Sequence, residues 1–280
     1  MSVERHNYEY DIDLEGASAP AFVARLVGGN KKVLEIGAGP GSITKVLKYN
    51  NNCEVVGLER DETALPKLSQ FCKKVFQADL NEPDWDRMLI DETPFDVVVS
   101  ADVLEHVYEP LAVLKKIKQL MSDSGEVVVS VPHASHLAII ACLLDEDFQY
   151  RDWGLLDRTH IRFFGLKNIQ ELFRSAGLKI IDARFVITPP EESEFAKKWH
   201  KLPQGIRNEL KNYEKGYIYQ VVVKAVSQEY PGHEIELMNL SVDVNDRSKQ
   251  SFIESSAPKR ILRRVLGDKG IKFVRSFIKR

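Results

Sequence analysis

Three alternating glycines, Gly37, Gly39 and Gly41, follow a short apolar run in the segment KVLEIGAGPG at residues 32–41. This pattern predicts a strand, a tight turn and a helix. Glycines let the backbone approach a ligand where a side chain would collide, and the following helix directs unpaired N–H groups at the same place. We therefore expect a nucleotide-like ligand at the carboxyl edge of a parallel sheet. Because the spacing is not the dinucleotide G-x-G-x-x-G, a turn that only joins strand to helix is the alternative.

Two acids stand where later predicted strands end. Glu59 closes the run CEVVGLE, and a carboxylate there can accept hydrogen bonds from both ribose hydroxyls of a nucleoside. Asp79 follows the run KVFQ and could accept from the exocyclic amine of an adenine, with Leu80 against the ring. The alternatives are a solvated acid at a strand end for Glu59 and a turn residue for Asp79.

Three histidines in the segment 133–165 are candidates for a general base. A hydroxyl nucleophile is a weak acid, and histidine ordinarily titrates near neutral pH. Among His133, His136 and His160, we favour His160 as the base, with Asp157 as its orienting partner and His136 as the second choice. The alternative is that His160 makes structural hydrogen bonds.

Other polar residues in the same segment leave two functions open. Arg151, Arg158 and Arg162 could bind a phosphate or carboxylate of an acceptor, or could pair with neighbouring acids. Aspartates and histidines are present, but no metal-ligand spacing is evident, so we predict no metal site. The chain has three cysteines, without the pattern of a disulfide framework or a zinc site.

The elements that would position these residues alternate strongly. Five β-α repeats in a row predict a doubly wound α/β fold with a mostly parallel sheet. Two further strands follow, one before and one after a polar helical stretch. We divide the chain into an N-terminal arm (1–17), an α/β domain (18–227) with an insert that should cover an acceptor site (133–165), a polar linker (228–257) and a basic amphipathic tail (258–280).

Composition describes an ordinary globular protein. The chain of 280 residues is 44% hydrophobic and 29% charged, with a net charge of −2. Few cysteines and an N-terminus without an apolar core predict a cytoplasmic protein, and the longest apolar run, at 137–144, is too short to span a bilayer. The basic tail could lie on an anionic membrane surface, dock onto a protein partner, or be a solvated or packed terminal helix. Nucleic acid is disfavoured as a partner, because no recognition module is visible.

The order VLEIGAGPG, GLE, QADL and FDVVVSADVLEHV resembles the class I S-adenosylmethionine-dependent methyltransferases, over roughly residues 18–226. The resemblance implies a seven-stranded Rossmann-like sheet with a reversed last strand. It implies that the methionine part of the cofactor is contacted by Glu35, Gly37, Ala38 and Gly39, and the ribose by Glu59 and Arg60. It also implies that Asp79 and Leu80 contact the adenine, and that the region beside the sulfonium is lined by Ala101, Asp102 and His106.

The insert, with VPHASH and GLLDRTHIRFF, is similar to methyltransferases among bacterial glycan and natural-product enzymes. An Asn-Pro-Pro-Tyr-like motif is missing after the fourth strand, which weighs against base or glutamine amino groups as the target. We therefore expect methyl transfer from S-adenosylmethionine to a hydroxyl of a sugar, glycan or other small polar acceptor. The alternatives are a nicotinamide-dependent oxidoreductase and a catalytically inactive, cofactor-binding scaffold subunit. The sequence does not predict the oligomeric state.

Overall fold

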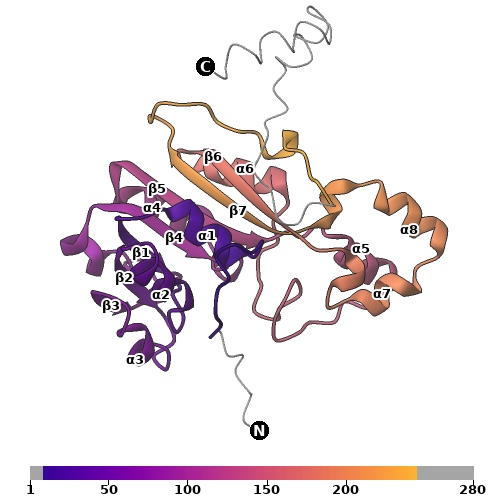
Figure 1. Ribbon diagram of the computed structural model, residues 1–280, viewed down its shortest axis with the longest axis horizontal. Helices are drawn as coiled ribbons and strands as arrows, with labels where there is room; N and C mark the ends of the chain where they lie inside the picture. Colours follow the sequence, from indigo (N-terminus) through magenta and orange to yellow (C-terminus); the bar gives the residue numbers. More distant parts are fainter. Residues whose placement is uncertain (1–8, 245–280) are drawn as a thin grey trace, which may run out of the picture.

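A seven-stranded sheet forms the centre of the molecule (Figure 1). The computed structural model describes residues 9–244 of the chain. The strand order is β3-β2-β1-β4-β5-β7-β6; β1 to β5 are parallel, and β7 is antiparallel to both of its neighbours. This confirms the expected fold with its reversed last strand. The strands are β1 Lys32–Ile36, β2 Glu54–Glu59, β3 Lys74–Gln77, β4 Phe95–Ala101, β5 Met121–Pro132, β6 Leu178–Ile187 and β7 Ile218–Ser227.

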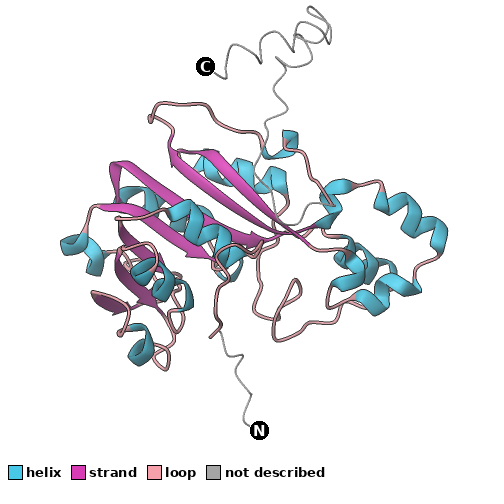
Figure 2. Ribbon diagram, viewed as in Figure 1, coloured by secondary structure: helices cyan, strands magenta, loops and turns pink. Residues whose placement is uncertain are grey.

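Helices lie on both faces of the sheet (Figure 2). Helices α1 and α2 pack on one face and α4 and α6 on the other, where short 3-10 turns complete the cover. The helices are α1 Ala19–Val27, α2 Ser42–Tyr49, α3 Leu65–Leu68, α4 Pro110–Leu120, α5 Leu137–Leu144, α6 Leu166–Ser175, α7 Ala196–Lys201 and α8 Gln204–Lys211. The 3-10 turns are η1 Arg87–Glu92, η2 Leu104–His106, η3 Pro190–Glu192, η4 Glu214–Tyr217 and η5 Leu237–Asn239.

The central strands read as continuous apolar runs because both of their faces are buried. In β1, Val33 points to the cluster formed with α1 and α2, whereas Leu34 and Ile36 belong to the cluster on the opposite face. None of the three has exposed surface. Successive side chains of a strand alternate between faces, so a parallel strand covered on both sides needs apolar residues throughout. This burial holds the carboxyl ends of β1 and β4 in register, Ile36 beside Ser100.

The insert at 133–165 contains a helix, which the expectation of a loop did not include. Leu137 and Ala141 of α5 are fully buried and pack against Trp199 of α7. With α8, these helices form the lobe at the right of Figure 1. The apolar run at 137–144 is therefore a short, wholly apolar helix that α7 covers on one side, while Leu143 and Leu144 are exposed.

The segment after β7 also differs from the expected linker at 228–257. Leu237, Leu240 and Val242 are buried in the main core, and the N–H of Ile235 donates to the carbonyl of Ile180 in β6 at 2.8 Å. Residues 245–257, the basic tail at 258–280 and the first eight residues of the arm lie outside the described residues. Within 9–244, no helix is both long and apolar enough to cross a membrane.

Candidate active site

The glycine turn lies at the carboxyl end of β1 and is fixed by its surroundings. The N–H groups of Gly37 and Ala38 donate to the carbonyl of Leu58 at 2.7 and 3.2 Å. Gly37 has φ of 67°, and a Cβ there would lie 2.5 Å from a methyl group of Val103. Gly39, with φ of 54°, would meet no other atom within 4 Å. The turn is thus packed on one side and open at Gly39, where a ligand can approach the backbone.

Glu59 lies beside this opening, at the end of β2. Its carboxylate accepts from the N–H groups of Gly39, Arg60 and Asp61, each at 2.7 Å. These bonds orient the carboxylate next to the turn without using all of its lone pairs, because two oxygens offer about four acceptor positions. One acceptor position therefore remains for a ribose hydroxyl, and bonds from both hydroxyls would require one of these N–H groups to give way.

Asp79 and Leu80 follow β3 along the same edge. The Asp79 carboxylate accepts from the N–H and the side-chain amide of Asn81, both at 2.9 Å, and Arg60 Nη1 lies 3.6 Å from its other oxygen. These contacts are those of a turn residue, which was the alternative reading. Leu80 is partly buried and packs on the main core. The geometry is compatible with both readings of Asp79.

Glu35 is buried under the turn, and its side chain is 3% exposed. Its carboxylate accepts from the hydroxyl of Thr44 at 2.6 Å. Burial, with a contribution from the charge of Glu59, raises the pKa of Glu35 to about 8, although the hydrogen bond from Thr44 opposes the shift. A positive charge bound nearby would favour the ionised form of this group.

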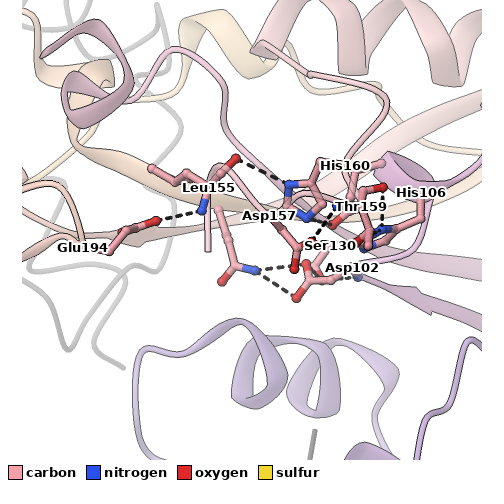
Figure 3. Close-up of polar contacts among 10 residues, drawn as sticks. Asp102, His106, Ser130, Leu155, Asp157, Thr159, His160 and Glu194 are labelled. Carbon is pink, nitrogen blue, oxygen red and sulfur yellow. Dashed lines mark hydrogen bonds and ion pairs between the residues drawn. The ribbon is translucent and has the colours of Figure 1, made fainter. Parts of the chain in front are cut away.

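Asp102 follows Ala101 at the end of β4 with an unusual backbone, φ of 52°. Its carboxylate accepts from the hydroxyl of Ser130 at 2.8 Å and from the amide of Gln220 at 2.9 and 3.0 Å (Figure 3). The residue is exposed to solvent at the carboxyl end of β4. Non-glycine residues in this backbone region are uncommon and cluster at functional sites.

The N-terminal arm lies beside the start of α2, just after the glycine turn. The N–H of Tyr10 donates to the hydroxyl of Ser42 at the start of α2, at 3.1 Å, and Glu9 pairs with Lys67. Burial, followed by the charges of Asp102 and Glu35, raises the pKa of the Tyr10 hydroxyl. Farther along the arm, Ile12 and Leu14 pack on the apolar cluster of α1 and α2.

A cluster of ionisable side chains lies just beyond Asp102. Glu105 and His106 are in η2, and His160 comes from the insert; His160 Nε2 lies 4.0 Å from Glu105 Oε1. The two imidazole rings are 4.8 Å apart between centroids and inclined by 66° (Figure 3 shows both histidines). Burial raises the pKa of Glu105 well above its ordinary value and lowers the pKa of both histidines. Sequence reasoning missed Glu105, whose role depends on a residue far along the chain.

We expected Asp157 to orient His160, but its carboxylate bonds to Thr159 and not to the His160 ring. Its carboxylate accepts from the N–H of Thr159 at 2.8 Å and from its hydroxyl at 2.6 Å. The Thr159 hydroxyl oxygen lies 3.1 Å from Nδ1 of His106 (Figure 3). Nδ1 of His160 instead lies 3.4 Å from the carbonyl of Leu155. Asp157 therefore acts on His106 through Thr159.

His136 and His133 are structural in the described fold. His136 accepts from the N–H of Ala138 at Nδ1, at 3.1 Å, which caps α5, and its Nε2 is 2.9 Å from the carbonyl of Thr188. Both ring nitrogens are thus used, so His136 has no free lone pair for an acceptor's proton. Burial lowers the pKa of each of the two histidines to about 4. His133 bonds through Nδ1 to the carbonyl of Ile218.

The three arginines of the insert have partners within the protein. Arg158 pairs with Asp152 at 2.8 Å, as in the ion-pair alternative, and the Arg151 guanidinium lies 4.9 Å from the ring centre of Phe195. Arg162 donates to the carbonyls of Ile161 and Tyr108. These contacts reduce the case for an anion site built by the arginines.

Glu59 and Asp102 thus lie at the same edge of the sheet as the open backbone at Gly39, which suits a nucleoside carrying positive charge. A family model described as a methyltransferase domain matches residues 8–183. The chain belongs to the S-adenosylmethionine-dependent methyltransferase family. This confirms the resemblance at the level of the family.

Curated relatives of this methyltransferase are named for ubiquinone biosynthesis. The mitochondrial ubiquinone biosynthesis O-methyltransferase of Dictyostelium discoideum is 22% identical over 58% of this chain and 54% of its own length, so the match spans about half of that protein. The corresponding protein of Cereibacter sphaeroides is 25% identical over 65% of this chain and 70% of its own. A similarity specific to glycan or natural-product enzymes is not among these relatives.

Solved structures agree with the fold. An S-adenosylmethionine-dependent methyltransferase from Thermotoga maritima matches with a TM-score of 0.50 and 15% identity, covering 75% of this chain and 88% of its own. At this identity the likeness concerns the fold alone.

Proposed function

We propose that this chain transfers a methyl group from S-adenosylmethionine to an oxygen of a small acceptor. The proposal rests on the buried cluster of Glu105 and two histidines at the end of β4, next to the glycine turn. Val103 contacts Gly37, so the cluster that follows Val103 lies at the same sheet edge as the turn. Relatives named as O-methyltransferases support oxygen as the methylated atom.

For the cofactor, the proposal uses the residues expected from the family. Gly37, Ala38 and Gly39 would hold the methionine part through the backbone, and Glu35 and Asp102 supply negative charge near a cationic ligand. Glu59 would accept from the ribose hydroxyls, with Arg60 beside it. Asp79 and Leu80 would meet the adenine, and Ala101 and His106 would line the space around the sulfonium.

His160 is our proposal for the residue that receives the acceptor's proton. Its Nδ1 faces the carbonyl of Leu155, a geometry in which Nδ1 carries the hydrogen and Nε2 keeps its lone pair. Bound S-adenosylmethionine supplies an electrophilic methyl: the O–CH₃ bond forms, the S–CH₃ bond breaks, and its electron pair remains on sulfur. The proton of the acceptor hydroxyl goes to Nε2 of His160, beside the carboxyl of Glu105, which can stabilise the imidazolium.

The acceptor class is the least constrained part. A sugar or glycan hydroxyl follows from the similarity of the insert, and a quinone-type hydroxyl follows from the names of the relatives. Tyr150, Trp153, Ile161 and Phe163 of the insert are exposed large apolar side chains, and they favour an acceptor with an apolar ring or chain. Contact of the basic tail with a membrane surface or a protein partner remains a proposal about residues outside the described range.

The oxidoreductase alternative fits poorly. A dinucleotide fold has two mononucleotide-binding halves of parallel strands, but here the strands beyond β5 are β7, antiparallel, and β6. The scaffold alternative predicts preserved cofactor binding without turnover.

The deciding experiment is calorimetric titration with S-adenosylmethionine, S-adenosylhomocysteine and NAD in parallel, followed by release of S-adenosylhomocysteine with nucleotide sugars, glycans and phenolic acceptors. We expect micromolar binding of the first two ligands, none of NAD, and an O-methyl product. Binding of NAD alone, or a product methylated on nitrogen, would overturn the proposal. Cofactor binding without turnover on any acceptor class would favour the scaffold.

A further inference from the structure

We propose that Glu105, His106 and His160 bind a divalent transition-metal ion where the insert meets η2, just beyond the end of β4. Their ligand atoms all lie within 4.8 Å of one another. Two ligand atoms on one ion at about 2.1 Å each are no more than about 4.2 Å apart. That maximum applies to ligands on opposite sides of the ion, whereas neighbouring ligands of a tetrahedral or octahedral ion lie about 3.0–3.4 Å apart. Glu105 Oε1 and His160 Nε2 are 4.0 Å apart, so side-chain shifts on the order of 1 Å would bring the three ligands onto one ion.

The buried, unpartnered carboxylate of Glu105 is the observation that points to a ligand. The residue is 1% exposed, and neither carboxylate oxygen is hydrogen-bonded to another residue of the described chain. A buried carboxylate without partners is costly, because it has lost water and gained nothing in exchange. Within residues 9–244, no lysine or arginine forms an ion pair with Glu105. A bound cation would supply the missing positive charge and use the free lone pairs of the carboxylate oxygens.

The two histidines already have the tautomer that metal binding needs. Nδ1 of His106 lies 3.2 Å from the carbonyl of Thr159, and Nδ1 of His160 lies 3.4 Å from the carbonyl of Leu155. A carbonyl only accepts, so each Nδ1 carries the hydrogen and each Nε2 keeps its lone pair. Metal-bound histidines almost always donate their second nitrogen in this way.

The backbone holds the two halves of the cluster together. The carbonyl of Glu105 accepts from the N–H groups of Ile161 and Arg162 at 2.9 and 3.0 Å, which fixes the insert against η2. The hydroxyl of Thr159 donates its one hydrogen to Asp157. Toward Nδ1 of His106 it can therefore act only as an acceptor. Asp157 and Thr159 are thus positioning residues for the ligand His106.

The donor set indicates the class of ion. Two imidazoles and one carboxylate suit Zn²⁺, Mn²⁺ or Fe²⁺, whereas Mg²⁺ and Ca²⁺ prefer oxygen ligands. Three protein ligands leave coordination positions for water or an acceptor oxygen. An ion there would lower the pKa of a bound hydroxyl. In that case His160 acts as a ligand and not as the direct base. The role of the ion in the reaction rests on the proposed function, whereas the ion site itself does not.

The test is Mn²⁺ binding to the full chain after chelation, followed by the electron paramagnetic resonance signal of free Mn²⁺, with Zn²⁺ as competitor and Mg²⁺ as comparison. We expect one Mn²⁺ per chain, displaced by Zn²⁺ and not by Mg²⁺. Glu105→Gln and His160→Gln should each weaken Mn²⁺ binding by more than about 100-fold, and Thr159→Val by about 10-fold. His200→Gln, an exposed histidine of α7, is the matched control and should bind like the wild type.

The outcomes separate this site from the proposed function. Equal Mn²⁺ affinity in wild type, Glu105→Gln and His160→Gln would overturn the ion site, and two variants are used because a buried glutamine at 105 can impair folding. Turnover that survives chelation without Mn²⁺ binding would also overturn it and would leave His160 as the direct base. Mn²⁺ binding without S-adenosylmethionine binding would support the ion site and overturn the proposed function.

Discussion

His160 Nε2 lies 4.0 Å from a carboxylate oxygen of Glu105, although the two residues are far apart along the chain. The contact exists because an extended part of the insert runs along η2 and bonds to its backbone. It brings an imidazole with a free lone pair to a buried acid at the end of β4. Most of the chemistry proposed above depends on this pair.

Replacing His160 should affect turnover more than cofactor affinity. We expect His160→Gln to lower kcat by about 10²–10⁴-fold, the usual contribution of a general acid–base group, with the dissociation constant for S-adenosylmethionine unchanged. Steady-state kinetics on the identified acceptor, paired with calorimetry, measures both quantities. The exposed His200→Gln should match the wild type in both, and full activity of His160→Gln would make His160 structural.

Glu59 should matter for cofactor binding and not for the reaction step. Glu59→Gln replaces a charged acceptor by a neutral one, so we expect affinity for S-adenosylmethionine to fall by about 10–100-fold, or about 1.4–2.7 kcal/mol. Glu62→Gln, at an exposed position shortly after in the chain, is the control. Calorimetric affinities that are equal in the two variants would remove Glu59 from the site.

His136 should contribute to stability with a clear pH dependence. Its folded pKa of about 4 is below the ordinary value of 6.5, so the unfolded chain binds more protons between these values. Stability from His136 is complete above pH 6.5 and is lost as the pH falls toward 4, by on the order of 3 kcal/mol.

We expect His136→Ala to lower the free energy of unfolding at pH 7 by about 2–4 kcal/mol, because the N–H of Ala138 and the carbonyl of Thr188 lose their partner. Urea unfolding measures this difference. The variant should also show a shallower loss between pH 6.5 and 4. His233→Ala, which changes an exposed histidine, should retain the wild-type curve. A parallel curve for His136→Ala would contradict the assignment.

Glu35 should destabilise the free protein as the pH rises. Its folded pKa of about 8 exceeds the ordinary 4.5, so the folded state binds more protons between these values and stability falls across that window. The full effect is on the order of 4–5 kcal/mol. Glu35→Gln should remove the decline, seen by urea unfolding at pH 5.5 and 8.5. Glu171→Gln, at an exposed position, is the control. If the free energy of unfolding differs between wild type and Glu35→Gln by the same amount at both pH values, the prediction for Glu35 is wrong.

The packed side of the glycine turn gives a steric prediction. Gly37→Ala places a Cβ 2.5 Å from Val103 in a backbone region with φ of 67°, so we expect a loss of roughly 2–4 kcal/mol in stability together with weaker cofactor binding. Adding Val103→Ala should recover the part caused by the clash. Urea unfolding of the single and double variants measures the recovery, and identical values for both would exclude Val103 as the cause.

Sequence patterns predicted those parts of the molecule that depend on neighbouring residues. The glycine turn, Glu59 at the end of β2 and the start of α1 at its Ser18 cap follow from local spacing, burial and capping. The mostly parallel sheet follows from β-α alternation, and the reversed last strand from the family resemblance.

What the sequence did not predict depends on contacts between distant segments. Glu105 looks like one more acid in a short helical turn until the insert brings His160 to it. His136 looks like a base until α5 and Thr188 are seen to use both of its nitrogens. The helix in the insert depends on Trp199, which lies many residues later. Such pairings are set by tertiary packing, for which a single sequence carries little local signal.

The segment that returns over the sheet after β7 protects a vulnerable border. β6 is an outermost strand, and Ile235 bonds to its main chain while Arg174 pairs with Glu234 to hold the segment in place. Uncovered outer strands recruit strands from other molecules, which leads to aggregation. An expression boundary placed after Ser227, where the alternating strands end, would remove this cover. A shortened protein should therefore keep residues 228–244 if it is to stay dispersed in solution.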